Sequence, residues 1–140
     1  MLAWILNFAA SKAMQELLKP RVLVVDDEPL IRWSIAETLG DNGYSVVGTG
    51  DAESARTAVR DATSPFDVIL LDLRLPDSDD LSLLRTIRQM TPSSRVVLMT
   101  AFGTQEVIDD ALDLGAFRVM GKPFEIEDMA HVVDQANVCH

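Results

Sequence analysis

The feature that most limits the fold of this chain is a set of short apolar runs that each end abruptly on a polar residue. The runs, each with the polar residue that ends it, are 21–25 with Asp26, 66–71 with Asp72 and 95–99 with Thr100. Runs of this length and composition are typical of strands buried on both faces of a parallel sheet. Since the carboxyl ends of parallel strands meet at one edge, where open sheets bind ligands, these polar residues are expected to lie together.

Two more residues join this expected edge. Asp27 follows Asp26 directly, and Lys122 follows a fourth apolar segment, 117–120. Three carboxylates that lie close together repel one another, so the arrangement is tolerable mainly if a divalent cation and the ammonium group neutralise them. The pattern therefore indicates a site for a metal ion and an anion. Taken singly, each residue also has a plainer interpretation, as a capping acid, a surface lysine or a strand-end threonine.

Patterns typical of amphipathic helices separate the expected strands. We expect strands at 22–25, 45–47, 66–72, 96–99 and 117–120, and helices at 29–39, 52–59, about 80–87, 107–114 and about 125–136. Asp51 is expected to cap the second helix. Trp33 lies off the apolar face of the first helix and is expected to be partly buried, with contact to a partner as the alternative. Strands that alternate with helices require helix-length, right-handed crossovers, so the expected fold is α/β with a doubly wound, five-stranded parallel sheet. A nucleotide-binding domain is disfavoured because no Gly-rich phosphate loop follows the first strand.

Charge and cysteine content restrict the partners. The net charge of −10 and the pI near 4.4 argue against nucleic acid or an anionic membrane as a direct partner. Any DNA-directed role would therefore need another domain. The single cysteine, Cys139, excludes an internal disulfide and fits a reducing, cytoplasmic location.

Residues 1–18 precede the first expected strand and need a separate interpretation. The apolar start at 2–6 superficially resembles a signal sequence, but it lacks basic residues and is interrupted at Asn7, well short of the ~20 residues that span a bilayer. On a helical wheel, apolar residues from Leu2 to Leu17 form one stripe. We therefore expect an amphipathic helical extension over 1–20, neither signal nor anchor, and one domain over 21–140. A loosely ordered extension is the alternative.

Several fragments at the expected strand ends match a known pattern in order and spacing. They are Val-Asp-Asp-Glu-Pro at 25–29, Leu-Asp at 71–72, Leu-Pro-Asp at 75–77, Met-Thr-Ala at 99–101 and Lys-Pro-Phe at 122–124. Together they resemble the receiver domain of bacterial two-component response regulators, and most of all the receivers of enhancer-binding transcription activators. The resemblance covers 21–140 and implies a flavodoxin-like sheet with the strand order 2-1-3-4-5. It also implies a cis peptide bond between Lys122 and Pro123.

The resemblance assigns phosphoryl chemistry to three side chains. Asp72 would accept a phosphoryl group from a sensor histidine kinase or a phosphotransfer protein, forming an acyl phosphate. Lys122 would pair with the phosphoryl oxygens, Thr100 would hydrogen-bond one of them, and the small Ala101 would leave the group room to enter. The chain would then be a phosphoacceptor that loses its phosphoryl group to water, and not a turnover enzyme.

The resemblance also implies a bound Mg²⁺ ion. Asp27, Asp72 and the backbone carbonyl of Arg74 would bind it, and Asp26 would act through water, because Mg²⁺ prefers oxygen ligands and keeps several waters. Phosphorylation would change the interaction with a downstream effector domain or protein. A homodimer through the N-terminal helix or the C-terminal helical face is a further option.

Two positions depart from the family pattern, and two other functions stay open. Val119 stands where receivers usually carry an aromatic residue on the last strand, so Phe102 or Phe117 would substitute for it, or loop movement would carry the signal. Asp80 stands where glycine is common. The first alternative function is a receiver-like interaction module that is not phosphorylated. The second is a phosphatase, which is disfavoured because such an enzyme needs an acid where Arg74 stands.

Overall fold

The computed structural model describes residues 11–138, and its centre is a five-stranded, fully parallel sheet. The strands are β1 (Arg21–Val25), β2 (Ser45–Thr49), β3 (Val68–Asp72), β4 (Arg95–Thr100) and β5 (Arg118–Gly121). They lie in the order β2-β1-β3-β4-β5, which confirms the flavodoxin-like topology expected from the sequence.

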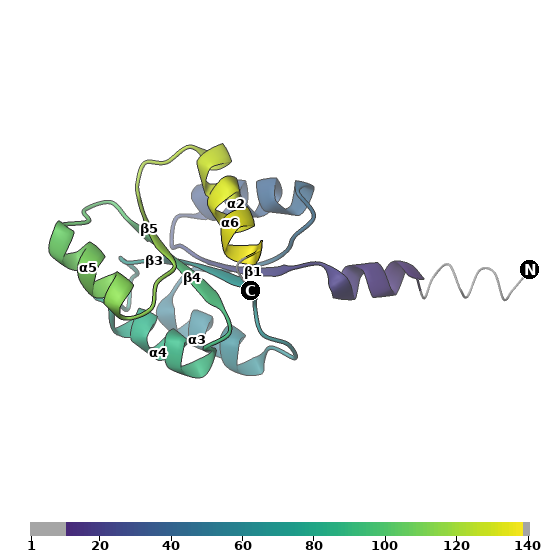
Figure 1. The fold of residues 1–140 in the computed structure, drawn as a ribbon, viewed down its shortest axis with the longest axis horizontal. Coiled ribbons are helices and arrows are strands. Elements are labelled where there is room, and N and C mark those ends of the chain that lie inside the picture. The colour runs from purple at the N-terminus through teal and green to yellow at the C-terminus, as the bar shows by residue number, and fades with distance from the viewer. Residues whose placement is uncertain (1–10, 139–140) are drawn as a thin grey trace, which may run out of the picture.

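Helices cover both faces of the sheet (Figure 1). They are α2 (Pro29–Asp41), α3 (Ala52–Asp61), α4 (Ser82–Met90), α5 (Gln105–Asp113) and α6 (Ile126–Val138). Helices α2 and α6 pack on one face, while α3, α4 and α5 lie on the other. The strand–helix alternation of the sequence is therefore a three-layer α/β sandwich.

Strand β1 is apolar from Val22 to Val25 because helices lie on both faces of the sheet there. Leu23 and Val25 pack toward α3 and α4, Val22 and Val24 pack toward α2 and α6, and none of these side chains is exposed. A strand with one wet face would alternate apolar with polar residues. The sequence therefore has unbroken apolar runs because each inner strand packs against one hydrophobic core on each face of the sheet.

The register of the strands brings their carboxyl ends to one edge. Val25 pairs with Leu71, so Asp26, which directly follows β1, and Asp72, the last residue of β3, emerge side by side. On the other side of β3, Asp72 pairs with Met99. The polar residues that end the apolar runs therefore share the edge where α/β sheets hold ligands.

Local signals set most of the helix boundaries. The Asp51 carboxylate accepts a hydrogen bond of 2.6 Å from the Ser54 N–H and caps α3, as expected. Helix α4 begins at Ser82, two residues later than expected, because Asp80 forms a turn in which its side chain accepts the Ser82 N–H. Strand β3 begins two residues later than expected, and the carbonyl of Phe66 instead accepts a hydrogen bond from a serine hydroxyl.

One expectation about the surface of α2 is wrong. Trp33 is 61% exposed rather than partly buried. The face of α2 that meets the sheet is filled by Ile35 and Leu39, each 1% exposed, and Trp33 points away from it. The indole ring is therefore available on the outside of α2.

Residues 11–18 form a helix that projects away from the domain (Figure 1). Its apolar side chains Met14, Leu17 and Leu18 are 55%, 79% and 73% exposed. The helical part of the expected extension is confirmed over these residues, whereas the first half of the predicted apolar stripe lies outside the described residues. None of the helices in residues 11–138 has the length and hydropathy that a membrane span requires.

Candidate functional site

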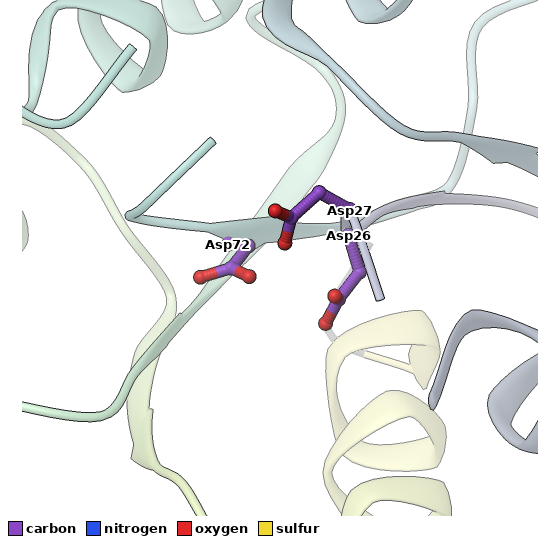
Figure 2. A group of neighbouring side chains, drawn as sticks. All are labelled: Asp26, Asp27 and Asp72. Carbon is purple, nitrogen blue, oxygen red and sulfur yellow. The ribbon is translucent and has the colours of Figure 1, made fainter. Parts of the chain in front are cut away.

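Three carboxylates meet where β1 and β3 end (Figure 2). Asp26, Asp27 and Asp72 each offer an oxygen, and these oxygens lie within 4.8 Å of one another. Asp26 is completely buried and Asp72 is 6% exposed, whereas Asp27 faces solvent. Carboxylates held this close repel one another unless positive charge is brought to them.

Lys122 supplies part of that charge from the segment after β5. Its Nζ lies 2.8 Å from Asp26 Oδ2 and 2.9 Å from Asp72 Oδ2, and a weaker contact of 3.7 Å reaches Glu28. Burial alone would lower the pKa of Lys122, but the hydrogen bonds to Asp26 and Asp72 outweigh it, and the pKa lies above the ordinary lysine value. The ammonium group is therefore charged at neutral pH and bridges two strands of the sheet.

The buried position of Asp72 disfavours the ionised form of its carboxyl group. Burial raises the pKa of Asp72 above the usual range, even though Lys122 and a 3.2 Å hydrogen bond from the Arg74 N–H both oppose this. Holding this buried carboxylate ionised costs free energy, and a bound cation would offset that cost. It also leaves a nucleophilic oxygen that solvent does not fully stabilise.

Thr100 lies at the same edge, at the end of β4, and is 3% exposed. Its carbonyl accepts the Lys122 N–H at 2.8 Å, and its hydroxyl accepts the Phe102 N–H at 3.2 Å. The loop after β4 packs tightly on it, since a Cβ on Gly103 would lie 2.9 Å from Thr100 Cγ2. A glycine at this position therefore allows the loop to lie against the threonine.

Arg74 connects the two loops that border the site. Its guanidinium lies over the Phe102 ring, 5.2 Å from the centroid, so the loop after β3 contacts the loop after β4. The structure thus places Asp26, Asp27, Asp72, Thr100 and Lys122 at one edge with Arg74 beside them, while their chemical roles stay predictions.

Sequence reasoning did not single out two contacts that support these loops. The Arg32 guanidinium donates to the main-chain carbonyl of Asp26 at 2.6 Å. The Asp77 carboxylate accepts the N–H groups of Ala52 and Glu53, at 2.8 and 3.1 Å, and these hydrogen bonds hold the pKa of Asp77 below its usual range. An available signal for Asp77 was the start of α3, where Asp51 alone cannot satisfy all the free N–H groups.

The donor set fits a Mg²⁺ ion. All three candidate side chains are carboxylates, which suit a hard cation that takes oxygen ligands. Both oxygens of Asp26 accept hydrogen bonds, from Lys122 Nζ at 2.8 Å and from the Glu28 N–H at 2.9 Å. Both oxygens of Asp72 also accept hydrogen bonds, from Lys122 Nζ at 2.9 Å and from the Arg74 N–H at 3.2 Å, whereas Asp27 faces solvent. Receiver domains generally bind Mg²⁺ at such an acidic pocket.

An open, mainly apolar hollow of ≈ 430 Å³ adjoins this edge. It lies between α2 and the segment after β5, and Ala101 and Lys122 connect it to the acidic cluster. Leu30, which is 80% exposed, and Phe124 belong to its wall. A molecule that approaches the acidic cluster through this hollow would therefore pass an apolar surface.

Comparison with known proteins places this geometry in context. Residues 22–134 match the family model of the response regulator receiver domain. The chain is 35% identical over 118 residues to the response regulator protein PilR of Pseudomonas aeruginosa, a match that covers 84% of this chain and 26% of PilR. It is 31% identical over 117 residues to the chemotaxis protein CheY of Bacillus subtilis, covering 82% of this chain and 95% of CheY.

Solved structures show the same fold. The receiver domain of NtrX from Brucella abortus superposes with a TM-score of 0.76 at 33% identity, over 85% of this chain and 99% of that one. The receiver domain of a putative LuxO repressor from Vibrio parahaemolyticus gives a TM-score of 0.80 at 24% identity, over 87% and 92%. The chain spans only 26% of PilR and 56% of the transcriptional regulatory protein PdtaR of Mycobacterium tuberculosis.

Proposed function

Because this chain belongs to the response regulator receiver domain family of two-component systems, we propose that it is a phosphorylation-driven switch whose phosphoacceptor is Asp72. The observation that supports this most is the position of the Asp72 carboxylate, which lies beside Asp27 and 2.9 Å from the Lys122 ammonium. Acid, cation site and ammonium are the groups that phosphoryl transfer to a carboxylate requires.

In the proposed reaction an oxygen of Asp72 attacks the phosphorus of a phosphohistidine on a sensor kinase or phosphotransfer protein. The new O–P bond forms as the P–N bond breaks, and the electron pair leaves with the imidazole. Transfer of this kind depends chiefly on alignment and on neutralising the phosphoryl oxygens. Hydrolysis of the acyl phosphate by water would reset Asp72.

The neighbouring side chains are suited to neutralise the negative charge of the phosphoryl oxygens. Lys122 would move one hydrogen bond from Asp72 to a phosphoryl oxygen while it keeps the one to Asp26, 2.8 Å away. Thr100 would turn its hydroxyl from the Phe102 N–H toward the phosphoryl group. Asp27, Asp72 and the Arg74 carbonyl would hold Mg²⁺, which supplies further neutralisation of the phosphoryl oxygens when bound.

The apolar hollow beside the site supports the choice of a protein as phosphodonor. A kinase or phosphotransfer helix that carries the histidine could rest on the exposed Leu30 and Trp33 of α2 while its imidazole reaches Asp72. On the output side, β5 carries Val119, which is half-buried and has no ring to reorient. We therefore propose that the loops after β3 and β4, joined by Arg74 and Phe102, transmit the change to an effector domain or protein.

The test is incubation with Mg²⁺ and acetyl phosphate, followed by intact mass measurement. The wild-type chain should gain one phosphoryl group, and Asp72→Asn should gain none because the amide is not a nucleophile of this kind. Asp61→Asn, which removes an exposed carboxylate at the end of α3, is the matched control and should behave like the wild type.

Absence of phosphoryl uptake by the wild-type chain, from acetyl phosphate and from a kinase alike, would contradict the proposal. It would favour a module that binds partners without being phosphorylated. Uptake that persists in Asp72→Asn would instead place the phosphoacceptor elsewhere.

A further inference from the structure

Arg32 contacts the acidic edge from α2, outside the set of residues used so far. It lies near the start of the helix, and its side chain is half-buried. Its Nη1 donates a hydrogen bond of 2.6 Å to the carbonyl oxygen of Asp26. That carbonyl belongs to the peptide group that joins Asp26 to Asp27, so the guanidinium acts directly on the link between two of the three clustered acids.

Two glycines leave the space in which this side chain lies. A Cβ on Gly48 would lie 3.1 Å from Arg32 Cδ, and a Cβ on Gly50 would lie 3.0 Å from Arg32 Nη1. Both distances are tighter than ordinary van der Waals contact between carbon and a neighbour. The residues are two apart on the chain, so both face the same side of the segment that ends β2.

Thr49, the residue between the two glycines, holds the N–H group of Asp26. The Asp26 N–H donates to the carbonyl of Thr49 at 3.0 Å, while the Asp26 carbonyl accepts from Arg32. Both peptide groups of Asp26 are therefore held by hydrogen bonds. The peptide group that leads into Asp27, the exposed member of the cluster, is therefore oriented by hydrogen bonds in the absence of a cation.

We propose that Arg32 is a positioning residue for the divalent cation: it orients the peptide between Asp26 and Asp27 so that the Asp27 carboxylate meets the ion. This inference rests on the proposed Mg²⁺-dependent function. The charge of Arg32 adds to that of Lys122 on an edge that carries Asp26, Asp27 and Asp72, with Glu28 nearby. Groups that orient metal ligands commonly set metal affinity although they never touch the metal.

The experiment compares Mg²⁺ affinity with the phosphorylation rate in variants of the 140-residue chain. Mg²⁺ binding is measured by titration calorimetry, and the rate of phosphoryl uptake from acetyl phosphate is measured as a function of Mg²⁺ concentration. Arg32→Gln should weaken Mg²⁺ binding by about tenfold, while the rate at saturating Mg²⁺ should stay within about twofold of wild type. Arg32→Lys should recover part of the affinity, because an ammonium can still donate to one carbonyl.

A second variant reaches the same contact without removing the charge. Gly50→Ala places a methyl group against Arg32 Nη1 and should shift Mg²⁺ affinity in the same direction as Arg32→Gln, by a smaller factor. The matched controls are Arg60→Gln, which removes an exposed guanidinium from α3, and Gly40→Ala, where a Cβ meets nothing within 4 Å. Both controls should keep the wild-type Mg²⁺ affinity.

Three outcomes would overturn the inference. They are a wild-type Mg²⁺ affinity in Arg32→Gln, a loss of maximal rate as large as the loss of affinity, or no Mg²⁺ binding by the wild-type chain. A wild-type chain that binds Mg²⁺ but takes up no phosphoryl group would refute the proposed function alone. In that case the calorimetric comparison of Arg32→Gln with Arg60→Gln still decides the role of Arg32.

Discussion

The Asp72 carboxylate is expected to lower the stability of the fold at neutral pH, although the proposed function requires it. It is nearly buried at the end of β3, and this burial raises its pKa although Lys122 lies 2.9 Å away. Ionised Asp72 therefore opposes folding at neutral pH, where the unfolded chain would hold it in water. Residues that serve a reaction often reduce the stability of the fold in this way.

We expect Asp72→Asn to unfold a few degrees above the wild type at pH 7 in buffer without divalent cations. Asparagine has the shape of the protonated acid but carries no charge that must be buried. Because the raised pKa means that folding disfavours the ionised form, the difference should shrink as the pH falls and vanish well below ~3.9, the ordinary aspartate pKa, where Asp72 is protonated in both states. Thermal unfolding followed by circular dichroism across this pH range checks it.

Asp61→Asn is the control for this measurement. Asp61 is exposed and forms an ion pair with the exposed Arg60, so its replacement should change the unfolding temperature little at any pH. An Asp72→Asn variant that is less stable than wild type at pH 7 would show that the Lys122 ion pair outweighs the burial of the carboxylate.

Among the elements, α3 is connected by hydrogen bonds to the loop that follows β3. Asp77 accepts the Ala52 and Glu53 N–H groups, and Asp51 accepts the Ser54 N–H, so two acids satisfy the first turn of this helix. The N-terminus of a helix favours negative charge. The loop after β3 is therefore anchored through Asp77 to the start of α3.

We expect Asp77→Asn to free this anchor. An amide offers one acceptor where the carboxylate uses both oxygens, so the Ala52 and Glu53 N–H groups should exchange with solvent faster in the variant. Because the pKa of Asp77 is lowered, the anchor should persist in wild type as the pH falls through the usual aspartate range and be lost only below it. Hydrogen exchange and a pH titration, both by NMR, measure these effects.

The exchange of the Ser54 N–H serves as an internal control, since Asp51 caps it independently. Equal acceleration at Ser54 would mean that the whole helix had loosened. Unchanged exchange at Ala52 and Glu53 would show that water replaces Asp77 without loss.

At the scale of the whole molecule, the acidic cluster should make the fold sensitive to divalent cations. We expect Mg²⁺ to raise the unfolding temperature, because an ion that binds only the folded chain stabilises it by about 2.7 kcal/mol at a concentration one hundred times its Kd. Asp27→Asn should lose most of this gain. Differential scanning fluorimetry at matched ionic strength with NaCl separates site binding from general screening of the net charge of −10.

Most of the architecture follows from the sequence because its signals are periodic and strong. Apolar runs that end on Asp26, Asp72 and Thr100 predict buried parallel strands and their common edge, and the register of β1, β3 and β4 agrees. The exposure of Trp33 was missed, because a helical wheel cannot tell how much of α2 the sheet covers. The contact between Arg32 and Asp26 was missed because it joins a helix to a loop through the backbone, and periodicity does not report such pairs.

The two ends of the folded domain lie close together, on the side away from the acids. Residues 17–21 and Asn137 line one hollow near the starts of β1, β3 and β4, while Asp72 and Thr100 stand where strands finish. A surface tether, fluorophore or fused module attached at either end of the folded domain would therefore leave the acidic edge exposed. The domain can be immobilised or fused to another protein without blocking access to the carboxylates at that edge.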